Sequence, residues 1–461
     1  MNVADVTRIV GGHASSAPLP AWSFAALSTD SRTLEPDSLF VALKGENFDG
    51  NDFIDDAIAR GAVVVVCARG RALHREGVSF VEVDDTLRAL GDIAAAHRRQ
   101  FPIPIVAITG SNGKTTTKEL LHSILKVAFG ADRVLATRGN LNNLIGLPLT
   151  LARLSPIHGA AVVEMGMNAF GEIARMTEIA APTVGLITCI GSAHLEGLGS
   201  IEGVARAKGE LFAGLAADAV AVVNLDDPWV TRVAESFRGR KIAFGRNGDV
   251  RADNVEPLAV DRTRFHLVTD TGAAAVEIPL AGRHNVSNAL AAAGAAMAIG
   301  IDLGTIAEGL AQVAPPPMRL ATERLSNGVA LVNDAYNANP SSLRAAVDAM
   351  ADVVPERLIV VLGEMLELGE RSSELHEAAG RHVGSVRPAL LCALGTHARE
   401  LCEGAVTGGL APEKALVVGS HEAAAEAVAA AWRPGDLVLI KGSRGAQMER
   451  VVEALRRRVA A

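Results

Sequence analysis

The sequence contains few aromatic residues: they make up 3% of its 461 residues, and Tyr336 is the single tyrosine. Proteins that bind single-stranded nucleic acid usually stack bases on several aromatic side chains, which disfavours this class. An excess of basic residues is also missing, because 44 Lys and Arg stand against 52 Asp and Glu and give a net charge of -8. Nucleic-acid-binding domains typically carry a basic face. We therefore expect no nucleic-acid partner, whereas an anionic substrate held by a few cationic groups is compatible with this charge.

The four cysteines, at positions 67, 189, 392 and 402, form no CxxC pair and no metal-ligand spacing. Each stands in or beside an apolar stretch, which predicts reduced, mostly buried thiols of a cytosolic protein. The first residues lack the basic segment and apolar core of a signal peptide. The Ala-rich stretch 288–301 falls short of the roughly 20 apolar residues that span a bilayer. These absences predict a soluble, cytoplasmic protein without membrane insertion.

Hydrophobic residues are abundant, at 49%, and they are arranged in short runs between longer helical patterns. This alternation is typical of βαβ units and a parallel sheet, and the length predicts about three domains of roughly 150 residues each. The expected strands are 62–66, 103–109, 160–164, 184–190, 219–224, 329–333, 357–362, 389–394, 415–418 and 436–440. Expected helices include 114–127, 340–352, 421–432 and 445–458.

Two proline-rich segments suggest domain boundaries. FPIP at 101–104 ends one helical pattern, and APPP at 314–317 is stiff and extended, as suits a linker. The helix expected at 85–100 fits either neighbouring domain, so the first boundary is placed upstream of FPIP. The predicted domains are 1–83, 84–314 and 315–461.

The most specific local motif is the segment ITGSNGKTTTKEL, which begins at Ile108 and joins an expected strand to an expected helix. Gly110 and Gly113 allow a tight turn whose N–H groups converge on phosphate oxygens. Lys114 can neutralise phosphate charge, and the Thr115 hydroxyl can bind Mg²⁺. The spacing departs from the general P-loop pattern, because Ile108 stands where its first glycine is expected. An ordinary glycine-rich turn between a strand and a helix is the alternative.

Further polar residues follow expected strands, where ligands collect in open α/β sheets. Glu164 ends one strand, and His194 and Asp226 each follow another. Oxygen and imidazole groups at this edge can hold a metal ion near a bound triphosphate. Structural roles are the alternative for His194 and Asp226, because both stand in loop sequences. Lys208 lies on an expected helix, where a lysine is usually solvated.

Several strings together resemble the Mur ligases, over essentially the whole chain and most densely from 105 to 370. They are GSNGKTTTKE, TRGNLNNLIGLPLTL, VVEMGMNAFGEI, GSAHLEGLGSIEGVARAKGELF, GRHNVSNALAA, NDAYNANPSSLRAA, VLGEMLELG and KGSRGAQMERVV. The resemblance implies an α/β fold of three domains. These are a small N-terminal UDP-binding domain, a central P-loop-type parallel-sheet ATPase domain and a C-terminal Rossmann-like domain that binds an amino acid or dipeptide.

The resemblance also implies an activity. NLNNLIG, EMGMN and DAYNANP are similar to the family member that joins D-alanyl-D-alanine to UDP-N-acetylmuramoyl-tripeptide, and the DNPR motif expected of the diaminopimelate-adding member is missing. In this reaction ATP phosphorylates a substrate carboxylate, and an amine then displaces phosphate through a tetrahedral intermediate. The implied cofactors are ATP and two Mg²⁺ ions. The implied oligomeric state is a monomer.

The resemblance assigns roles residue by residue. Catalytic roles are implied for Lys114, Glu164, His194 and Lys208, with Mg²⁺ held by Thr115, Glu164, His194 and a carbamylated Lys208. ATP contacts are implied for Gly110, Ser111, Asn112, Gly113, Lys114, Thr115, Thr116, Asn285, Asn288, Arg319 and Asp334. Substrate contacts are implied for Ser31, Arg32, Lys44, Asp49, Asn140, Asn142, Asn143, Tyr336 and Asn337. Taken without the resemblance, Arg32 would be read as a surface arginine in a turn.

Two other functions remain open. One is a Mur-type or folylpolyglutamate-type ligase that adds a single amino acid, although a folate enzyme would lack the N-terminal DSR block and usually shows GKGS where this chain has GKTT. The other is a P-loop ATPase that acts as a switch. Such a protein would hydrolyse ATP without a carboxylate substrate and would need no UDP-binding domain.

Overall fold

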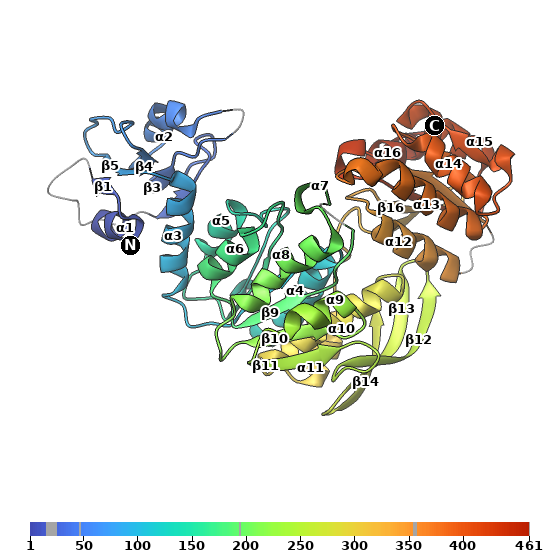
Figure 1. Cartoon of the computed structure of the whole chain (residues 1–461), viewed down its shortest axis with the longest axis horizontal. Coiled ribbons are helices and arrows are strands. Elements are labelled where there is room, and N and C mark those ends of the chain that lie inside the picture. The colour runs from blue at the N-terminus through green and yellow to red at the C-terminus, as the bar shows by residue number, and fades with distance from the viewer. Residues whose placement is uncertain (15–24, 46–47, 193–194, 354–356, 461) are drawn as a thin grey trace. The chain divides into compact units, whose positions relative to one another are not determined.

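The computed structural model describes residues 1–14, 25–45, 48–192, 195–353 and 357–460. Figure 1 shows their helices and strands. The strands form four sheets, one of five strands, two of six and one of three. As the alternating sequence pattern predicts, the three larger sheets are built mainly from parallel strands that alternate with helices.

The N-terminal sheet has the strand order β1-β5-β4-β3-β2, in which only β1 is antiparallel to its neighbour. Valines that alternate along β4 pack on one face against α1 and α3, and the other face packs against α2. The helix α3 also contacts α5 and α6, which explains why its sequence fits either neighbouring domain. The elements are α1 (Val3–Val10), β1 (His13–Ala14), β2 (Ala26–Ser28), β3 (Ser38–Val41), α2 (Ile54–Ala59), β4 (Ala62–Ala68), β5 (Ser79–Val83) and α3 (Thr86–Arg98).

The central sheet has the order β11-β10-β9-β6-β8-β7, and its inner strands are buried over their whole length. Strands buried on both faces read as continuous apolar runs, which is why this sheet is recognisable in the sequence. Its strands are β6 (Ile105–Thr109), β7 (Val134–Ala136), β8 (Ala160–Glu164), β9 (Val184–Ile187), β10 (Val220–Asn224) and β11 (Arg240–Phe244). Its helices are α4 (Lys114–Phe129), α5 (Gly146–Leu151), α6 (Glu172–Ala180), α7 (Leu195–Leu198), α8 (Ile201–Ala213) and α9 (Pro228–Ala234).

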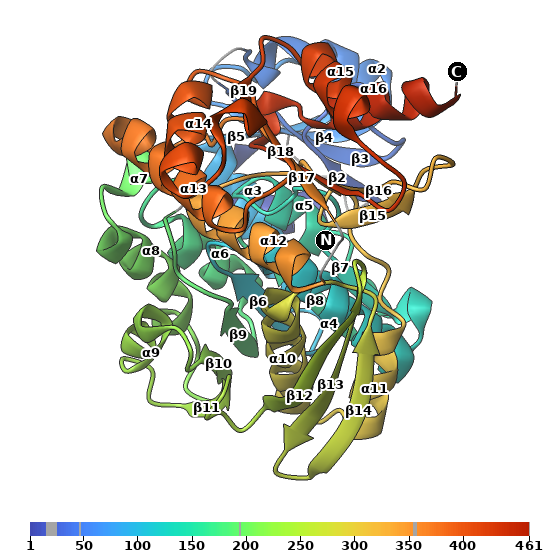
Figure 2. The ribbon, with the colours of Figure 1, turned by 90° about the vertical axis from the view of Figure 1, so that its right-hand side faces the viewer.

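A three-stranded antiparallel sheet follows, which the sequence analysis did not predict. It consists of β12 (Arg251–Ala259), β13 (Arg262–Thr269) and β14 (Gly272–Ile278), and Figure 2 shows the three strands side by side. Along β13, buried and exposed residues alternate, so one face is covered and the other meets solvent. The helices α10 (Arg283–Ala298) and α11 (Leu303–Ala311) contact this sheet.

The C-terminal sheet has the order β15-β16-β20-β17-β18-β19, with parallel pairing throughout except between β15 and β16. Two apolar clusters cover its two faces, as in a doubly wound fold. The strands are β15 (Ala321–Arg324), β16 (Ala330–Asp334), β17 (Leu358–Leu362), β18 (Leu390–Ala393), β19 (Ala415–Val417) and β20 (Leu437–Lys441). The helices are α12 (Pro340–Asp352), α13 (Ser372–Ser385), α14 (Ala398–Thr407), α15 (His421–Ala431) and α16 (Glu449–Ala460).

Other expectations from composition can be compared with the structure. The four cysteines are free thiols, and Cys67, Cys392 and Cys402 are buried, as predicted. The Ala-rich stretch belongs largely to α10, whose middle is packed in the protein interior. Over the residues that the structure describes, every helix is too short or too polar to cross a membrane.

Candidate active site

The phosphate loop lies between the end of β6 and the first residue of α4, as the sequence predicts. Gly110 and Gly113 have φ angles of +150° and +82°, a region that side chains disfavour. A Cβ atom on Gly110 would lie 1.9 Å from Oγ1 of Thr188, and one on Gly113 would lie 2.2 Å from Oδ1 of Asn288. Neither position therefore accepts a side chain, and the loop backbone stays open to a ligand.

The loop is attached to the residues that follow β9. The backbone N–H of Ser111 donates to the carbonyl oxygen of Cys189 at 2.8 Å, and the Thr188 hydroxyl donates to the carbonyl oxygen of Asn112 at 2.5 Å. Lys114 donates from Nζ to the carbonyl oxygen of Gly110 at 2.7 Å. The loop thus carries a positive charge beside the N-terminus of the 16-residue helix α4, and both features favour a bound anion.

Lys208 is the least expected feature of this region. It lies on α8 and is fully buried, with 0% exposure, and among the described residues its Nζ has no hydrogen-bond partner. Burial, and in second place the charge of Lys114, lower the pKa of Lys208 well below its usual range. A buried amine without a hydrogen-bond partner is costly for the fold, which makes Lys208 a candidate for a chemical role.

Glu164 ends β8 and is 3% exposed. Its carboxylate accepts a hydrogen bond of 2.8 Å from the side-chain amide of Asn142, and its backbone N–H donates to the Thr137 hydroxyl. The other two asparagines of this loop differ from Asn142. Asn143 accepts from the backbone N–H groups of Ile145 and Gly146 near the start of α5, whereas Asn140 is exposed.

His194, the third expected metal ligand, lies outside the described residues. Within the described part of the chain, no group of three His, Cys, Asp or Glu side chains is arranged to hold a metal ion. Asp226 accepts from the backbone N–H of Arg246, as suits a turn residue. Its neighbour Asp227, which the sequence analysis did not single out, caps α9 and accepts from the backbone N–H of Ile190 at 2.7 Å.

Asn285 and Asn288 lie on the first turns of α10 and are both buried. The Asn288 amide donates to Oδ1 of Asn285 at 3.0 Å, and Oδ1 of Asn288 accepts from the Thr117 hydroxyl of α4 at 3.3 Å. Thr116, another expected ATP contact, is also buried on α4. The two asparagines therefore join α10 to the helix that begins at the phosphate loop.

Arg319 reaches the phosphate loop from the segment after APPP. Its Nη2 donates to the Thr115 hydroxyl at 2.9 Å, and its guanidinium carbon lies 4.2 Å from the ring centroid of Tyr336. Asp334, expected to lie near the ribose, is mostly buried. Its Oδ2 is paired with Lys441 Nζ at 2.5 Å, and its Oδ1 accepts from the backbone N–H of Leu320 at 3.2 Å.

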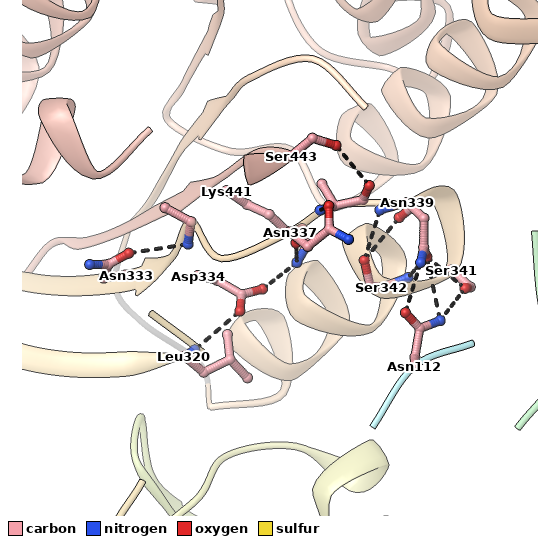
Figure 3. A network of polar contacts seen from close by, with 12 residues as sticks. Asn112, Leu320, Asn333, Asp334, Asn337, Asn339, Ser341, Ser342, Lys441 and Ser443 are labelled. Atoms are coloured by element: carbon pink, nitrogen blue, oxygen red, sulfur yellow. Dashed lines mark hydrogen bonds and ion pairs between the residues drawn. The ribbon is translucent and has the colours of Figure 1, made fainter. Parts of the chain in front are cut away.

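Four residues of this network were not among the expected site residues. Asn339 and Ser341, at the start of α12, bind the side chain of Asn112 in the phosphate loop, with distances of 2.8 Å and 2.7 Å. Lys441, the last residue of β20, and Ser443, two residues further on, bind the 334–339 loop (Figure 3). All four stand in sequence segments that carry the family resemblance, NDAYNANPSSLRAA and KGSRGAQMERVV. The resemblance of these segments is the signal that could have identified them as site residues.

The expected UDP-binding residues lie in the N-terminal sheet region. Arg32 is exposed and forms a bidentate ion pair with Asp30, which holds the pKa of that carboxyl at about 2. Ser31 beside it is buried. Asp49 accepts two hydrogen bonds from Asn51 and pairs by backbone with Lys44. The side chains of Arg32 and Asp49 are thus both engaged with neighbouring residues of the N-terminal sheet region.

The chain belongs to the Mur ligase family. Residues 23–98 match the Mur ligase family catalytic domain, 108–296 the Mur ligase middle domain and 318–444 the Mur ligase glutamate ligase domain. These three successive matches agree with the three-domain α/β architecture that the sequence predicts.

Individual relatives cover nearly the whole chain. The chain is 38% identical over 460 residues to the UDP-N-acetylmuramoyl-tripeptide–D-alanyl-D-alanine ligase of Escherichia coli, covering 99% of this chain and 98% of that enzyme. The crystal structure of MurF from Acinetobacter baumannii superposes with a TM-score of 0.91 at 33% identity, covering 99% and 98% of the two chains. That of MurF ligase from Thermotoga maritima, in complex with ADP, has a TM-score of 0.83 at 28% identity, covering 94% and 98%.

Proposed function

We propose that the protein is the ATP-dependent ligase that joins D-alanyl-D-alanine to UDP-N-acetylmuramoyl-tripeptide in peptidoglycan precursor synthesis. The observation that carries this proposal is the phosphate loop, where the positions of Gly110 and Gly113 leave no room for a side chain. The loop stands in a chain that matches ligases of this activity over 94–99% of its length. The Thermotoga relative binds ADP, which supports ATP as the nucleotide of this chain.

The chemistry requires an activated carboxylate, because a free carboxylate is a poor electrophile. The γ-phosphate of ATP passes to the carboxylate of the tripeptide, and ADP leaves. The amine of D-alanyl-D-alanine then attacks the acyl phosphate, and the tetrahedral intermediate collapses to an amide with loss of phosphate. Lys114 and the loop N–H groups hold the β- and γ-phosphates, and Arg319 adds a second positive charge at Thr115.

Thr115 and Glu164 carry oxygen atoms of the kind that bind Mg²⁺, and this chemistry supports the metal sites that the family resemblance implies. Thr115 and Glu164 would bind the first ion, and His194 with a carbamylated Lys208 the second. Bound Mg²⁺ would neutralise phosphate charge as it develops. The neutral Lys208 amine is the form that adds CO₂: an N–C bond would form, one N–H proton would leave, and the neutral amine would become an anionic carbamate with oxygen atoms that can bind a metal ion. The buried, unpartnered Nζ and its lowered pKa support this role.

The predicted domains can be assigned to ligands. Residues 1–83 would bind the UDP end through Ser31, Arg32, Lys44 and Asp49, and 84–314 would bind ATP. Residues 315–461 would bind the dipeptide, with Asn337 as a contact. Asn140, Asn142 and Asn143 would approach the muramoyl peptide, and for Asn142 its hydrogen bond to Glu164, a proposed Mg²⁺ ligand, supports this position. We further propose that the protein acts as a cytoplasmic monomer.

Amine-dependent phosphate release tests the activity. The full chain with ATP, Mg²⁺ and UDP-N-acetylmuramoyl-tripeptide should release phosphate when D-alanyl-D-alanine is added, and each turnover should give one amide product by mass spectrometry. Single amino acids such as D-alanine or meso-diaminopimelate should leave the rate at the level without amine.

Two results would contradict the proposal and support the other functions. Turnover with a single amino acid, but not with the dipeptide, would make the protein another amide ligase. ATP hydrolysis at full rate without any carboxylate substrate would make it a nucleotide switch.

Gly110→Ala should weaken nucleotide binding at least about tenfold, because the new methyl group would overlap the Thr188 hydroxyl and displace the loop. Isothermal titration with ADP measures the change. Gly419→Ala is the matched control, since a Cβ there meets nothing within 4 Å. Unchanged ADP affinity in Gly110→Ala would show that the loop does not bind the nucleotide.

A further inference from the structure

The segment that presents Arg319 has an unfavourable backbone. Met318 and Leu320, on either side of Arg319, have φ angles of +56° and +52°. This left-handed region is uncommon for residues with large side chains, and such residues gather at functional sites where other contacts hold them. The contacts that hold this segment therefore indicate which residues control the position of Arg319.

Residues 334–336 supply those contacts. The backbone N–H of Tyr336 donates to the carbonyl oxygen of Met318 at 3.2 Å, and the backbone N–H of Leu320 donates to Asp334 at 3.2 Å. The Tyr336 ring lies against the guanidinium of Arg319, whose Nη2 binds Thr115. The Arg319 side chain is thus held between an aromatic face and the phosphate loop.

Lys441 stabilises the residues that make these contacts. Its Nζ, on a residue that is 2% exposed, donates to Oδ2 of Asp334 at 2.5 Å and to the carbonyl oxygen of Asn337 at 3.0 Å. Figure 3 shows the Lys441 side chain extending to these two groups. Because one bond lies before Tyr336 in the chain and the other lies after it, the turn that carries the ring is fixed on both sides.

We propose that Tyr336 is a positioning residue, which holds the Arg319 guanidinium on the phosphate loop where it meets the terminal phosphate of ATP. The assignment rests on the proposed function for the identity of the nucleotide. It differs from the substrate contact expected from the sequence, because the Tyr336 ring lies against Arg319 of the same chain. Lys441 keeps the ring in place through Asp334.

The test compares two nucleotides that differ in the terminal phosphate. Dissociation constants of the full chain for ADP and for the analogue of ATP with a β,γ-methylene group are measured by isothermal titration in Mg²⁺. Tyr336→Leu should weaken analogue binding about tenfold and leave ADP binding unchanged, since only the analogue carries the phosphate that Arg319 meets. Tyr336→Phe keeps the ring and should restore most of the lost affinity. Unchanged ADP binding also reports a folded nucleotide site.

A double-variant cycle tests whether Tyr336 acts through Arg319. Arg319→Ala alone should weaken analogue binding at least as much as Tyr336→Leu, and adding Tyr336→Leu to it should change nothing further. If the losses of analogue affinity in the two single variants multiplied in the double variant, the two residues would act independently, and the proposal would be overturned. It would also be overturned if both Tyr336 variants raised only the KM for D-alanyl-D-alanine. Analogue binding by a chain that forms no amide would refute the proposed function but leave the positioning role standing.

Discussion

Lys114→Ala should reduce ligase turnover, followed as amine-dependent phosphate release, by about a thousandfold or more. Lys114 is the only residue of the phosphate loop segment 110–114 that carries a positive side chain, and its Nζ already lies on the loop, 2.7 Å from the carbonyl oxygen of Gly110. Charge that develops on the transferred phosphoryl group would lose the cation that the loop itself supplies, and such groups typically contribute two to three orders of magnitude or more. Single-turnover phosphate release at saturating ATP measures the effect.

Lys126→Ala is the matched control for this prediction. Lys126 lies on the same helix, α4, but it is exposed and three turns away from the loop. The control should keep the turnover and the KM for ATP of the unsubstituted chain. A Lys114→Ala protein with near-normal turnover would remove the main support for ATP-driven activation of the carboxylate.

The elements that sequence predicted well are those whose signals are local. The helix expected at 340–352 is found at Pro340–Asp352, because Asn339 caps it and Pro340 occupies its first position. Buried parallel strands were predicted within a few residues, since they read as apolar runs. The phosphate loop was also predicted, and Ile108, where the general pattern has glycine, is a fully buried residue of β6.

The elements that sequence missed depend on tertiary contacts. The strands β12–β14 carry charged residues on an exposed face and lack an apolar run. The helix expected at 445–458 begins only at Glu449, because Arg444–Ala446 form a 3₁₀ turn and Gln447 is left-handed. Lys441 ends an apolar strand like any lysine, and its partner Asp334 stands 107 residues earlier. No local pattern reveals such a pair.

The burial of Lys208 could not be predicted either, because an exposed and a buried helix lysine look the same in a sequence. Lys208→Ala should be nearly inactive, with turnover below about 1% of that of the unsubstituted chain, since a metal ligand would be lost. Formate or acetate should restore part of the turnover by placing a carboxylate in the space that the side chain leaves. Arg206→Ala, an exposed position on the same helix, is the control and should keep full turnover. Full activity of Lys208→Ala, or no effect of either carboxylate, would refute the carbamate.

Lys208→Met separates the chemical role from a structural one. Methionine has a similar length but no amine, so it avoids the cost of a buried amine without a hydrogen-bond partner, about 1–3 kcal/mol. In CO₂-free buffer with a chelator, the methionine variant should therefore unfold at a higher temperature than the unsubstituted chain and should still be inactive. Adding bicarbonate and Mg²⁺ should raise the unfolding temperature of the unsubstituted chain, because a carbamate and its metal bind only the folded state, and it should leave that of Lys208→Met unchanged. An equal response of the two proteins would mean that Lys208 is buried for structural reasons alone.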